Sequence, residues 1–399
     1  MTPHEKESAL ATITGLNAKP SGLPKEFVGQ TGQGAASVLP PPALSVNNSL
    51  NEILVYARFN KISDVHICSK NPIIFRRFGS LKAVTETLLT PERVQAMAKE
   101  SIKPELAAEF EKHGDLEFVH TIGGAGRFRL TLMKQRNGWD ITARLIAVSI
   151  PNFESTGMPK SCENLTKWAQ GLVLVTGPVG CGKSTTLATL VQMINQTRSD
   201  HIITIENPIE IVYTPKKCQI TQREVNLHTM SQANALRAAL REDPDILVVS
   251  ELRDLESIQL AVSAAETGHL VFGTMNTNNA SQTISRVIDS FPAEEQSVIK
   301  NMISESLRGV ITQQLIPKKD GSGVVPAYEI LIVNSAISNL IREGRTTQLT
   351  NTITTGRSSG MILFDHSLDE MVQKGVISGQ EAFERAISPN NFAKYLTAN

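Results

Sequence analysis

The apolar residues between positions 46 and 150 recur at the spacings of short helices and half-buried strands. Leu50, Ile53, Leu54 and Ala57 share one helical face behind Ser49, a residue type that caps helices. Farther along, apolar and polar residues alternate, as they do in a strand with one buried face. This pattern predicts a small α+β domain. Its expected helices open at Ser49, Thr90 and Pro104, and its expected strands are 64–67, 72–78, 116–122, 127–135 and 140–146.

A different pattern begins near residue 161, where apolar residues form continuous runs. Such runs are typical of strands that are buried on both faces, and here they alternate with helical segments. The sequence therefore predicts an α/β fold with a parallel sheet and helices on both faces, preceded by the smaller domain. After Pro292 the pattern is mostly helical. The expected strands are 172–175, 202–205, 246–249 and 270–274, and two of the later helices are 336–343 and 363–375.

Two further stretches fall outside these domains. Residues 1–45 are rich in Gly, Ser, Thr, Ala and Pro, a composition that buries too little apolar surface to order itself, so we expect a flexible leader. Residues 151–160 carry Pro151 and Pro159 and are predicted to be a linker and hinge. The two predicted domains are therefore 46–150 and 161–399.

The composition argues against several classes of protein. The formal net charge is zero, whereas nucleic-acid-binding proteins usually carry a basic excess, so no nucleic acid is expected as a partner. Four scattered cysteines form no C-x-x-C pair, which argues against a zinc site and a disulfide framework. The N-terminus lacks a signal-peptide pattern, and no apolar run approaches the roughly 20 residues that span a bilayer. We expect a cytoplasmic protein that reaches a membrane only through partners.

One stretch matches G-x-x-x-x-G-K-[ST], the pattern of phosphate-binding loops, between an apolar run and a helical segment. Glycines let the backbone curl so that successive N–H groups point at phosphate, and the following helix adds its positive end. Lys183 would neutralise the β- and γ-phosphates of ATP, and the Ser184 hydroxyl would bind Mg²⁺. The residues expected to hold the nucleotide are Gly177, Pro178, Val179, Gly180, Cys181, Gly182, Lys183, Ser184 and Thr185.

Cys181 lies inside this loop, close in sequence to Lys183 and to the start of a helix. A cation and a helix N-terminus both lower the pKa of a thiol. The sequence therefore predicts that alkylation of Cys181 inactivates the protein and that ATP prevents it. A small residue that fills a serine-sized position is the alternative interpretation.

Hydrolysis of a nucleotide also requires carboxylates beside the loop, and two glutamates are candidates. Glu206 follows the run 202–205, and Glu251 comes after the run 246–249. The carboxyl ends of parallel strands meet at one edge of a sheet, so both side chains would reach the cleft that holds the loop. The sequence predicts that these carboxylates hold the metal and aim the attacking water. A solvated surface carboxylate is the ordinary alternative for either residue.

Four segments together resemble the Walker A, Asp box, Walker B and His box of secretion ATPases, and within that superfamily the chain is most similar to the PilT-like type IV pilus retraction ATPases. These segments are 177–184, 204–210, 241–246 and 267–274. Further support comes from 222–225, 291–295 and 336–343. The resemblance covers residues 47–386, and the leader lies outside it.

This resemblance implies a homo-hexameric ring, in which each chain has a RecA-like ATPase domain and a PAS-like N-terminal domain. Carried over position by position, Glu206 would be the general base that positions the attacking water. Glu251 would hold Mg²⁺ through water, and His269 would belong to the His box. The expected cofactors are ATP and Mg²⁺.

The resemblance also implies that arginines of the N-terminal domain approach the phosphates. Arg144 is the first candidate, and Arg127 and Arg129 match further arginines of this kind. Such side chains neutralise charge that develops on the transferred phosphoryl group. Arginines on the exposed face of a half-buried strand are the alternative.

The chain departs from the family pattern at four positions. Asn276 stands where the His box carries a second histidine, Asn207 where an aspartate is expected, Ser250 where a glycine is expected, and Ser338 where the pilus signature has arginine. Asparagine at position 276 can still donate a hydrogen bond to phosphate, but it carries no charge. These departures bear on catalytic rate, whereas the phosphate-binding loop is intact.

The predicted function is a motor ATPase for type IV pilus retraction, acting on a pilus or secretion platform protein of the inner membrane, with a paralogous pilus ATPase as a further candidate partner. Two alternatives stay open. In the first, the chain is a weakly active, nucleotide-binding accessory subunit that assembles with a stronger motor. In the second, it is a PilT-like motor of a conjugation or secretion system. A nucleic-acid translocase is disfavoured by the zero net charge and the absence of an aromatic-rich basic stretch.

Overall fold

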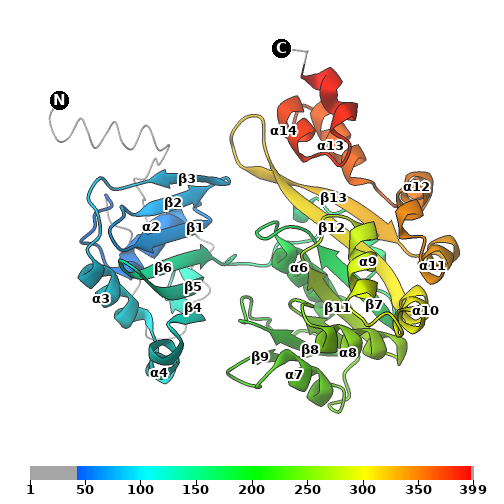
Figure 1. Ribbon diagram of the computed structural model, residues 1–399, viewed down its shortest axis with the longest axis horizontal. Helices are drawn as coiled ribbons and strands as arrows, with labels where there is room; N and C mark the ends of the chain where they lie inside the picture. Colours follow the sequence, from blue (N-terminus) through cyan, green and yellow to red (C-terminus); the bar gives the residue numbers. More distant parts are fainter. Residues whose placement is uncertain (1–42, 397–399) are drawn as a thin grey trace. The chain divides into compact units, whose positions relative to one another are not determined.

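The computed structural model describes residues 43–396, and the chain divides into two compact units, with the boundary along the chain between Ser149 and Ile150 (Figure 1). The predicted leader, apart from residues 43–45, lies outside the described residues. Each unit has its own sheet and its own hydrophobic core. The two units are therefore treated separately below.

The first unit contains a six-stranded antiparallel sheet with the strand order β3-β2-β1-β6-β5-β4, and helices pack against it. The predicted cap at Ser49 is confirmed, because its hydroxyl accepts from the Glu52 backbone N–H and the Glu52 carboxylate accepts from the Ser49 N–H. The elements are α2 (Leu50–Phe59), β1 (Asp64–Cys68), β2 (Ile74–Arg77), β3 (Ser80–Ala83), α3 (Pro91–Ser101), α4 (Pro104–His113), β4 (Asp115–Ile122), β5 (Gly126–Gln135) and β6 (Gly138–Leu145).

A half-buried arginine ties the first helix of this unit to the sheet. Arg58, in the last turn of α2, donates hydrogen bonds to the backbone carbonyls of Ala125, Ile146 and Arg127 at 2.7–3.0 Å. Its guanidinium also lies 4.7 Å from the centroid of the Phe128 ring. Burial lowers the pKa of Arg58 to about 10. Its role is structural, since all of these contacts lie within the unit.

The second unit is built on a seven-stranded sheet with the order β13-β12-β7-β11-β10-β8-β9. All neighbouring strands are parallel except β13, which pairs antiparallel with β12 at the edge. The predicted parallel α/β sheet is therefore confirmed for every strand but this one. The strands are β7 (Gly171–Thr176), β8 (His201–Glu206), β9 (Gln219–Glu224), β10 (Ile246–Val249), β11 (Leu270–Met275), β12 (Leu307–Pro317) and β13 (Val324–Ile332).

Helices cover both faces of this sheet (Figure 1). Val173 and Val175 of β7 pack in a cluster with buried residues of α6, whereas Leu172 and Leu174 pack with residues of α8, α9 and α10. Alternate residues of a strand point to opposite faces, so α6 lies across the sheet from those three helices. The helices are α5 (Ser161–Asn164), α6 (Lys183–Thr197), α7 (Gln232–Ala239), α8 (Leu255–Glu266), α9 (Ala280–Asp289), α10 (Gln296–Ser306), α11 (Ser335–Arg342), α12 (Leu349–Thr355), α13 (Phe364–Gln373) and α14 (Gly379–Arg385).

The expectation that the chain is mostly helical after Pro292 is wrong for its middle part. Strands β12 and β13 form a long antiparallel hairpin there and extend the sheet beside β7. Strand β12 begins at Leu307, directly after α10 ends at Ser306, so no turn residue marks the boundary. Polar Thr312 and Gln313 also interrupt its apolar run, although both are buried.

The stretch 151–160, predicted to be a linker, packs on the second unit. Phe153 and Met158 are buried in the same cluster as Val173 and residues of α6. The Pro151 carbonyl also accepts a hydrogen bond from the Thr189 hydroxyl at 3.3 Å. The second unit thus begins at Ile150, about ten residues earlier than the sequence indicates.

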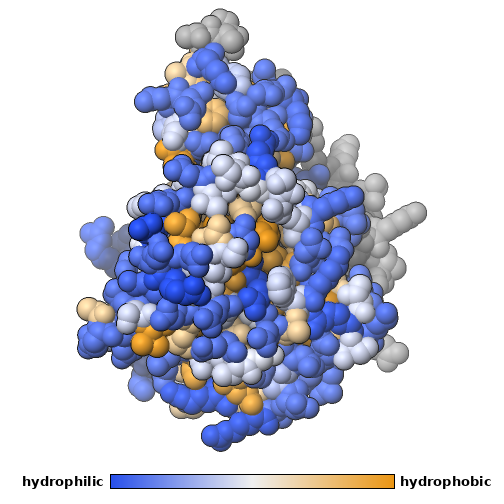
Figure 2. All heavy atoms as spheres, turned by 90° about the vertical axis from the view of Figure 1, so that its right-hand side faces the viewer, coloured by the Kyte–Doolittle hydropathy of each residue, from blue (hydrophilic) through white to orange (hydrophobic). Residues whose placement is uncertain are grey.

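The surface of the second unit is mainly hydrophilic on the face seen in Figure 2, where apolar side chains gather in small groups. Val298 of α10 is one exposed large apolar side chain of this unit. Within residues 43–396, no helix combines the length and the apolar character needed to cross a membrane.

Candidate functional site

The predicted phosphate-binding loop connects β7 to α6 at the carboxyl edge of the sheet of the second unit. Gly177, Gly180 and Gly182 have φ values of +141°, +80° and +92°, a backbone region that other residues rarely adopt. Gly182 stands at the N-cap of α6 and provides no side-chain cap, and the first turn of α6 holds no acidic residue. The helix thus presents uncapped N–H groups and its positive end to the loop, as a phosphate site requires.

Two side chains of this loop bear on nucleotide chemistry. The Lys183 ammonium donates to the carbonyls of Gly177 and Pro178 at 2.8 and 2.9 Å, which holds its charge beside the loop. Ser184, the second residue of α6, is exposed, so its hydroxyl is accessible to a metal ion. The loop has the backbone form and the donors that a nucleoside triphosphate needs.

Cys181 corrects one prediction from the sequence. Its side chain is buried at 3% exposure, and burial raises the pKa of the thiol despite the neighbouring Lys183. A Cβ at Gly177 would lie only 2.7 Å from its sulfur, so the thiol fills space under the loop. The prediction of a low pKa is therefore wrong, and Cys181 is a packing residue.

The strand order places four candidate positions along one edge of the sheet. The strands lie in the order β7, β11, β10, β8. Strand β7 leads into the loop, and β11 ends just before Asn276. Strand β10 ends shortly before Glu251, and β8 ends at Glu206. Neighbouring strands lie about 4.8 Å apart. The two predicted carboxylates are thus brought to the same edge as the loop, with Asn276 between the loop and Glu251.

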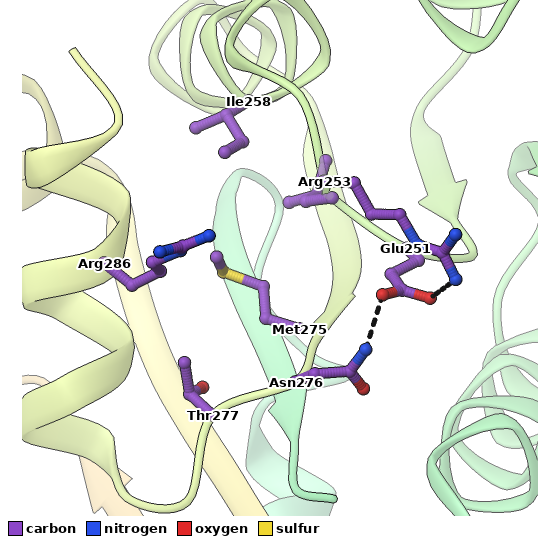
Figure 3. A pocket seen from close by; sticks show the side chains of 8 residues that line it. Glu251, Arg253, Ile258, Met275, Asn276, Thr277 and Arg286 are labelled. Atoms are coloured by element: carbon purple, nitrogen blue, oxygen red, sulfur yellow. Dashed lines mark hydrogen bonds and ion pairs between the residues drawn. The ribbon is translucent and has the colours of Figure 1, made fainter. Parts of the chain in front are cut away.

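Both oxygens of the Glu251 carboxylate accept hydrogen bonds (Figure 3). The Asn276 amide donates to Oε1 at 2.6 Å, and the Arg253 guanidinium donates to Oε2 at 2.6 Å. The Glu251 side chain is 23% exposed, whereas Arg253 is 76% exposed. Each carboxylate oxygen has a second lone pair, so Glu251 can still accept from a metal-bound water.

A cavity of about 420 Å³ adjoins Glu251 on the side of α8 and α9. Arg286 of α9, Ile258 of α8 and Met275 of β11 line it (Figure 3). The cavity therefore lies on the sheet face opposite α6. Its lining residues are Glu251, Leu252, Arg253, Ile258, Met275, Asn276, Thr277 and Arg286.

Glu206 is oriented by two donors from neighbouring positions. Its Oε1 accepts from the Thr204 hydroxyl at 2.6 Å and from the Gln222 amide of β9 at 3.0 Å. Gln222 is itself fixed by the Ile211 carbonyl and the Tyr213 N–H, both at 2.9 Å. Burial raises the pKa of Tyr213, and the nearby Glu206 charge adds to this effect. The carboxylate thus has a defined direction, which suits a group that must aim a water molecule.

His269 is not brought to this edge. It precedes the first residue of β11, whose register pairs Leu270 with Gly171 and Met275 with Thr176. His269 therefore lies at the amino edge, one strand length from the loop, where its Nδ1 lies 3.1 Å from the Ala264 carbonyl. The structure does not place it with the other predicted site residues of this unit.

Arg144 lies on β6 of the first unit and forms an ion pair there. Its Nε lies 2.8 Å from Oδ1 of Asp64, a side chain that is 7% exposed. Arg129 of β5 lies 3.3 Å from the Glu117 carboxylate. The Arg144 side chain is 37% exposed.

Of the residues that orient the two glutamates, Asn276 was singled out in the sequence, but Thr204, Gln222 and Arg253 were not. Thr204 and Gln222 lie in segments that carried the family resemblance, but nothing in their spacing indicates a contact with Glu206. Arg253 follows Glu251 by two residues, and this short separation is the one feature of the sequence that could have indicated their contact. Within the described residues there is no cluster of three or more His, Cys, Asp or Glu that could hold a metal by itself.

A phosphate-binding loop at the carboxyl edge of a mostly parallel sheet defines a P-loop protein of the α/β class. The chain belongs to the Type II/IV secretion system protein family, which matches residues 43–385. The resemblance inferred from the four motifs is therefore confirmed.

Relatives and solved structures agree with this assignment. The chain is 43% identical over 343 residues to "Type IV pilus retractation ATPase PilT" of Pseudomonas aeruginosa, covering 86% of this chain and 99% of the relative. It is 41% identical over 313 residues to "Twitching motility protein" of Neisseria gonorrhoeae, covering 78% and 84%. A crystal structure of the pilus retraction motor PilT with bound ADP superposes with a TM-score of 0.76 at 41% identity, covering 86% of this chain and 99% of that one.

Proposed function

We propose that this chain is an ATP hydrolase that powers retraction of a type IV pilus. The observation that carries the proposal is an intact phosphate-binding loop with two oriented glutamates along the same sheet edge, in a chain 43% identical to a pilus retraction ATPase over nearly the whole of that relative. The similarity to a twitching motility protein supports the same function.

The proposed chemistry divides among few groups. The loop and the start of α6 bind the phosphates through backbone N–H groups, and Lys183 balances their charge. Glu206, aimed by Thr204 and Gln222, accepts the proton of the attacking water. We assign no contact with the nucleotide to His269, because it lies at the other edge of the sheet.

Ser184 and Glu251 are the residues proposed to hold Mg²⁺. An exposed hydroxyl and a carboxylate are oxygen ligands of the kind that this ion prefers, and Mg²⁺ usually keeps several waters. The ion, when bound with ATP, would draw charge from the phosphate oxygens. Glu251 is held in place for this by Asn276 and Arg253.

The assembly is proposed from the family resemblance. We propose that the chain forms a homo-hexameric ring and that its first unit has a PAS-like fold. The ring would be cytoplasmic and would bind a platform protein at the inner membrane, with a paralogous pilus ATPase as a further partner. In this ring Arg144 would approach the phosphates. Replacement of Arg144 by alanine in the full chain tests that role through a fall in kcat.

Steady-state turnover tests the enzymatic part. Glu206→Gln should lower kcat by about 10²-fold or more while nucleotide still binds, because only the proton acceptor is lost. Lys183→Ala should weaken binding itself, since the phosphates lose their nearest cation. The exposed Glu266→Gln is the matched control and should behave as the wild type. Equal turnover of wild type and Glu206→Gln would refute the assignment.

A deletion strain scored for surface pili and twitching tests the biological part. Excess surface pili without twitching support retraction. Bald cells would instead point to pilus assembly, and unchanged pili with a secretion or conjugation defect would point to another machine of the same family.

The accessory-subunit alternative rests on Asn207 and Asn276, which replace the residues expected in an active family member. It predicts that the purified protein binds ATP but turns over no faster than Glu206→Gln. ATP hydrolysis would then appear only after a paralogous motor is added, in rings that contain both proteins. Wild-type turnover well above the Glu206→Gln level excludes this alternative.

A further inference from the structure

A buried glutamine lies under the phosphate-binding loop. Gln313 of β12 is 2% exposed, and β12 is the strand that pairs with β7 on the side away from β11. Its amide Nε2 donates to the Cys181 carbonyl at 2.6 Å, and its Oε1 accepts from the Thr186 hydroxyl of α6 at 2.6 Å. One side chain thus joins the middle of the loop to the first turn of the following helix.

The backbone of the same residue contacts the beginning of the loop. A Cβ at Gly177 would overlap the Gln313 carbonyl oxygen, and one at Gly182 would lie 3.1 Å from its Nε2. Gly177 and Gly182 are the first and last glycines of the loop. Gln313 therefore packs closely against both ends of the loop. Glycine at positions 177 and 182 permits this packing, because a Cβ there would come too close to Gln313.

Only an amide of this length satisfies both contacts at once. The Cys181 carbonyl needs a donor, and the Thr186 hydroxyl is given an acceptor. Glutamate would place a negative charge against the Cys181 carbonyl, and leucine would remove both hydrogen bonds, which is costly inside a protein. The hydroxyls of Thr176 and Thr312, 2.8 Å apart, form a further buried contact, between the end of β7 and β12.

We propose that Gln313 is a positioning residue of the nucleotide site, which holds the loop in its phosphate-binding form before the nucleotide arrives. This inference rests on the proposed function, since it assigns to Gln313 the shape of the site that binds ATP. A loop that is already ordered loses less conformational entropy when the ligand binds. Removal of the amide should therefore weaken nucleotide binding more than it slows the chemical step.

The experiment compares Gln313→Leu, Gln313→Glu and Gln314→Leu in the full chain. Gln314 is the matched control because it is the next residue of β12, is partly exposed, and points to the other face of the sheet. Binding of a fluorescent ATP analogue gives Kd, and steady-state assays give KM and kcat. We expect both Gln313 variants to raise Kd and KM about tenfold with a smaller change in kcat, as the loss of one or two hydrogen bonds implies, and Gln314→Leu to match the wild type.

A second readout does not depend on activity. Hydrogen exchange of the amides at 180–184 in nucleotide-free protein should be faster in both Gln313 variants, while the remainder of the second unit exchanges as in the wild type. If Gln313→Leu fails to fold, Gln313→Glu, which has the same size, carries the same comparison. Circular dichroism melting monitors folding of each variant.

The possible results separate the two proposals. Wild-type Kd and wild-type loop exchange in the Gln313 variants would overturn the positioning role and leave the proposed function intact. Loss of kcat at unchanged Kd would also overturn it, since the effect would then lie in the chemical step. A wild-type protein that binds no nucleotide would overturn both.

Discussion

At the scale of single residues, local motifs were predictable and cross-strand contacts were not. The phosphate-binding loop occupies one continuous stretch, 177–184, so the sequence alone shows its glycines, its lysine and the start of the following helix. By contrast, Asn276 was interpreted as a potential partner of phosphate, and the structure shows that it donates to Glu251. Asn276 follows β11 and Glu251 follows β10, so their contact depends on these two strands being neighbours in the sheet. The sequence pattern does not specify the order of the strands.

The Asn276–Glu251 contact leads to a prediction about pH. Asn276→Ala removes one donor from the carboxylate and should lower kcat about fivefold to tenfold, because one charge-assisted hydrogen bond is lost. Asn276→His places an ionisable donor there and should add a new transition between pH 6 and 8 to the pH–rate profile. Stopped-flow phosphate release across that pH range measures both effects. A profile for Asn276→His that matches the wild type would contradict this role.

Burial of Cys181 predicts slow alkylation. Burial raises the pKa of this thiol, and it raises that of Cys68 to about 11 and that of Cys162 to about 12. The reactive thiolate is therefore scarce at neutral pH. Mass spectrometry after iodoacetamide treatment should find Cys181 largely unmodified with and without ATP. Rapid labelling that ATP blocks would restore the prediction made from sequence.

At the scale of elements, periodicity predicted helices α2, α3 and α4 and the buried parallel strands β7, β8, β10 and β11, but not strand β9 or the hairpin β12–β13. Helix α4 spans Pro104–His113 as predicted and ends at Gly114, whose φ of +83° is typical of a helix C-terminus. Strand β12 was missed because buried Thr312 and Gln313 break its apolar run. Both polar side chains serve tertiary contacts, so a local pattern cannot reveal them.

Strand β13 contributes another buried polar residue, Glu329. Its Oε1 accepts from the Ala280 N–H at 2.8 Å and its Oε2 from the Phe364 N–H at 3.4 Å, the first residues of α9 and α13. One carboxylate thus caps two helices. Burial raises the pKa of Glu329 even though both N–H groups act in the other direction.

This raised pKa predicts how stability depends on pH. The folded state holds the Glu329 proton more tightly than the unfolded chain does, so this group stabilises the fold below its ordinary pKa. The contribution is lost as the pH rises through the raised value. The unfolding free energy of the wild type minus that of Glu329→Gln should therefore fall from pH 4.5 toward neutrality. Urea unfolding at several pH values measures it, and a difference that is flat or rises with pH would contradict the assignment.

At the scale of the whole molecule, the chain consists of two units with separate cores. The cluster that contains Phe75 and Phe128 has residues of the first unit alone, and the clusters around Phe272 and Phe364 have residues of the second. The hydrophobic pattern changes between residues 150 and 161, and this change indicated two domains. The burial of Phe153 and Met158 was not predictable, because a proline-containing stretch of ten residues carries too few apolar positions to show a period.

The separate cores predict that residues 150–399 fold alone. Every contact described for the loop, Glu206 and Glu251 comes from this unit, so the fragment should unfold cooperatively and bind ATP. Chemical denaturation followed by circular dichroism, together with nucleotide titration, measures both. A fragment that begins at residue 161 is the matched comparison and should be less stable by about 2–4 kcal/mol, since it lacks two large buried side chains. Equal stability of the two fragments would contradict the assignment of 150–160 to the second unit.

The hairpin β12–β13 has a mechanical consequence. Its strands pair from Gly309–Ile332 to Pro317–Val324, and in this register Thr312, which contacts Thr176, lies opposite Glu329, which holds the starts of α9 and α13. A force on α13 would act on β13 at Glu329, because the N–H of Phe364, the first residue of α13, donates to this carboxylate. Through the paired strands, a displacement of α13 would then reach β12, whose Thr312 contacts Thr176 at the end of β7 and whose Gln313 contacts the phosphate-binding loop.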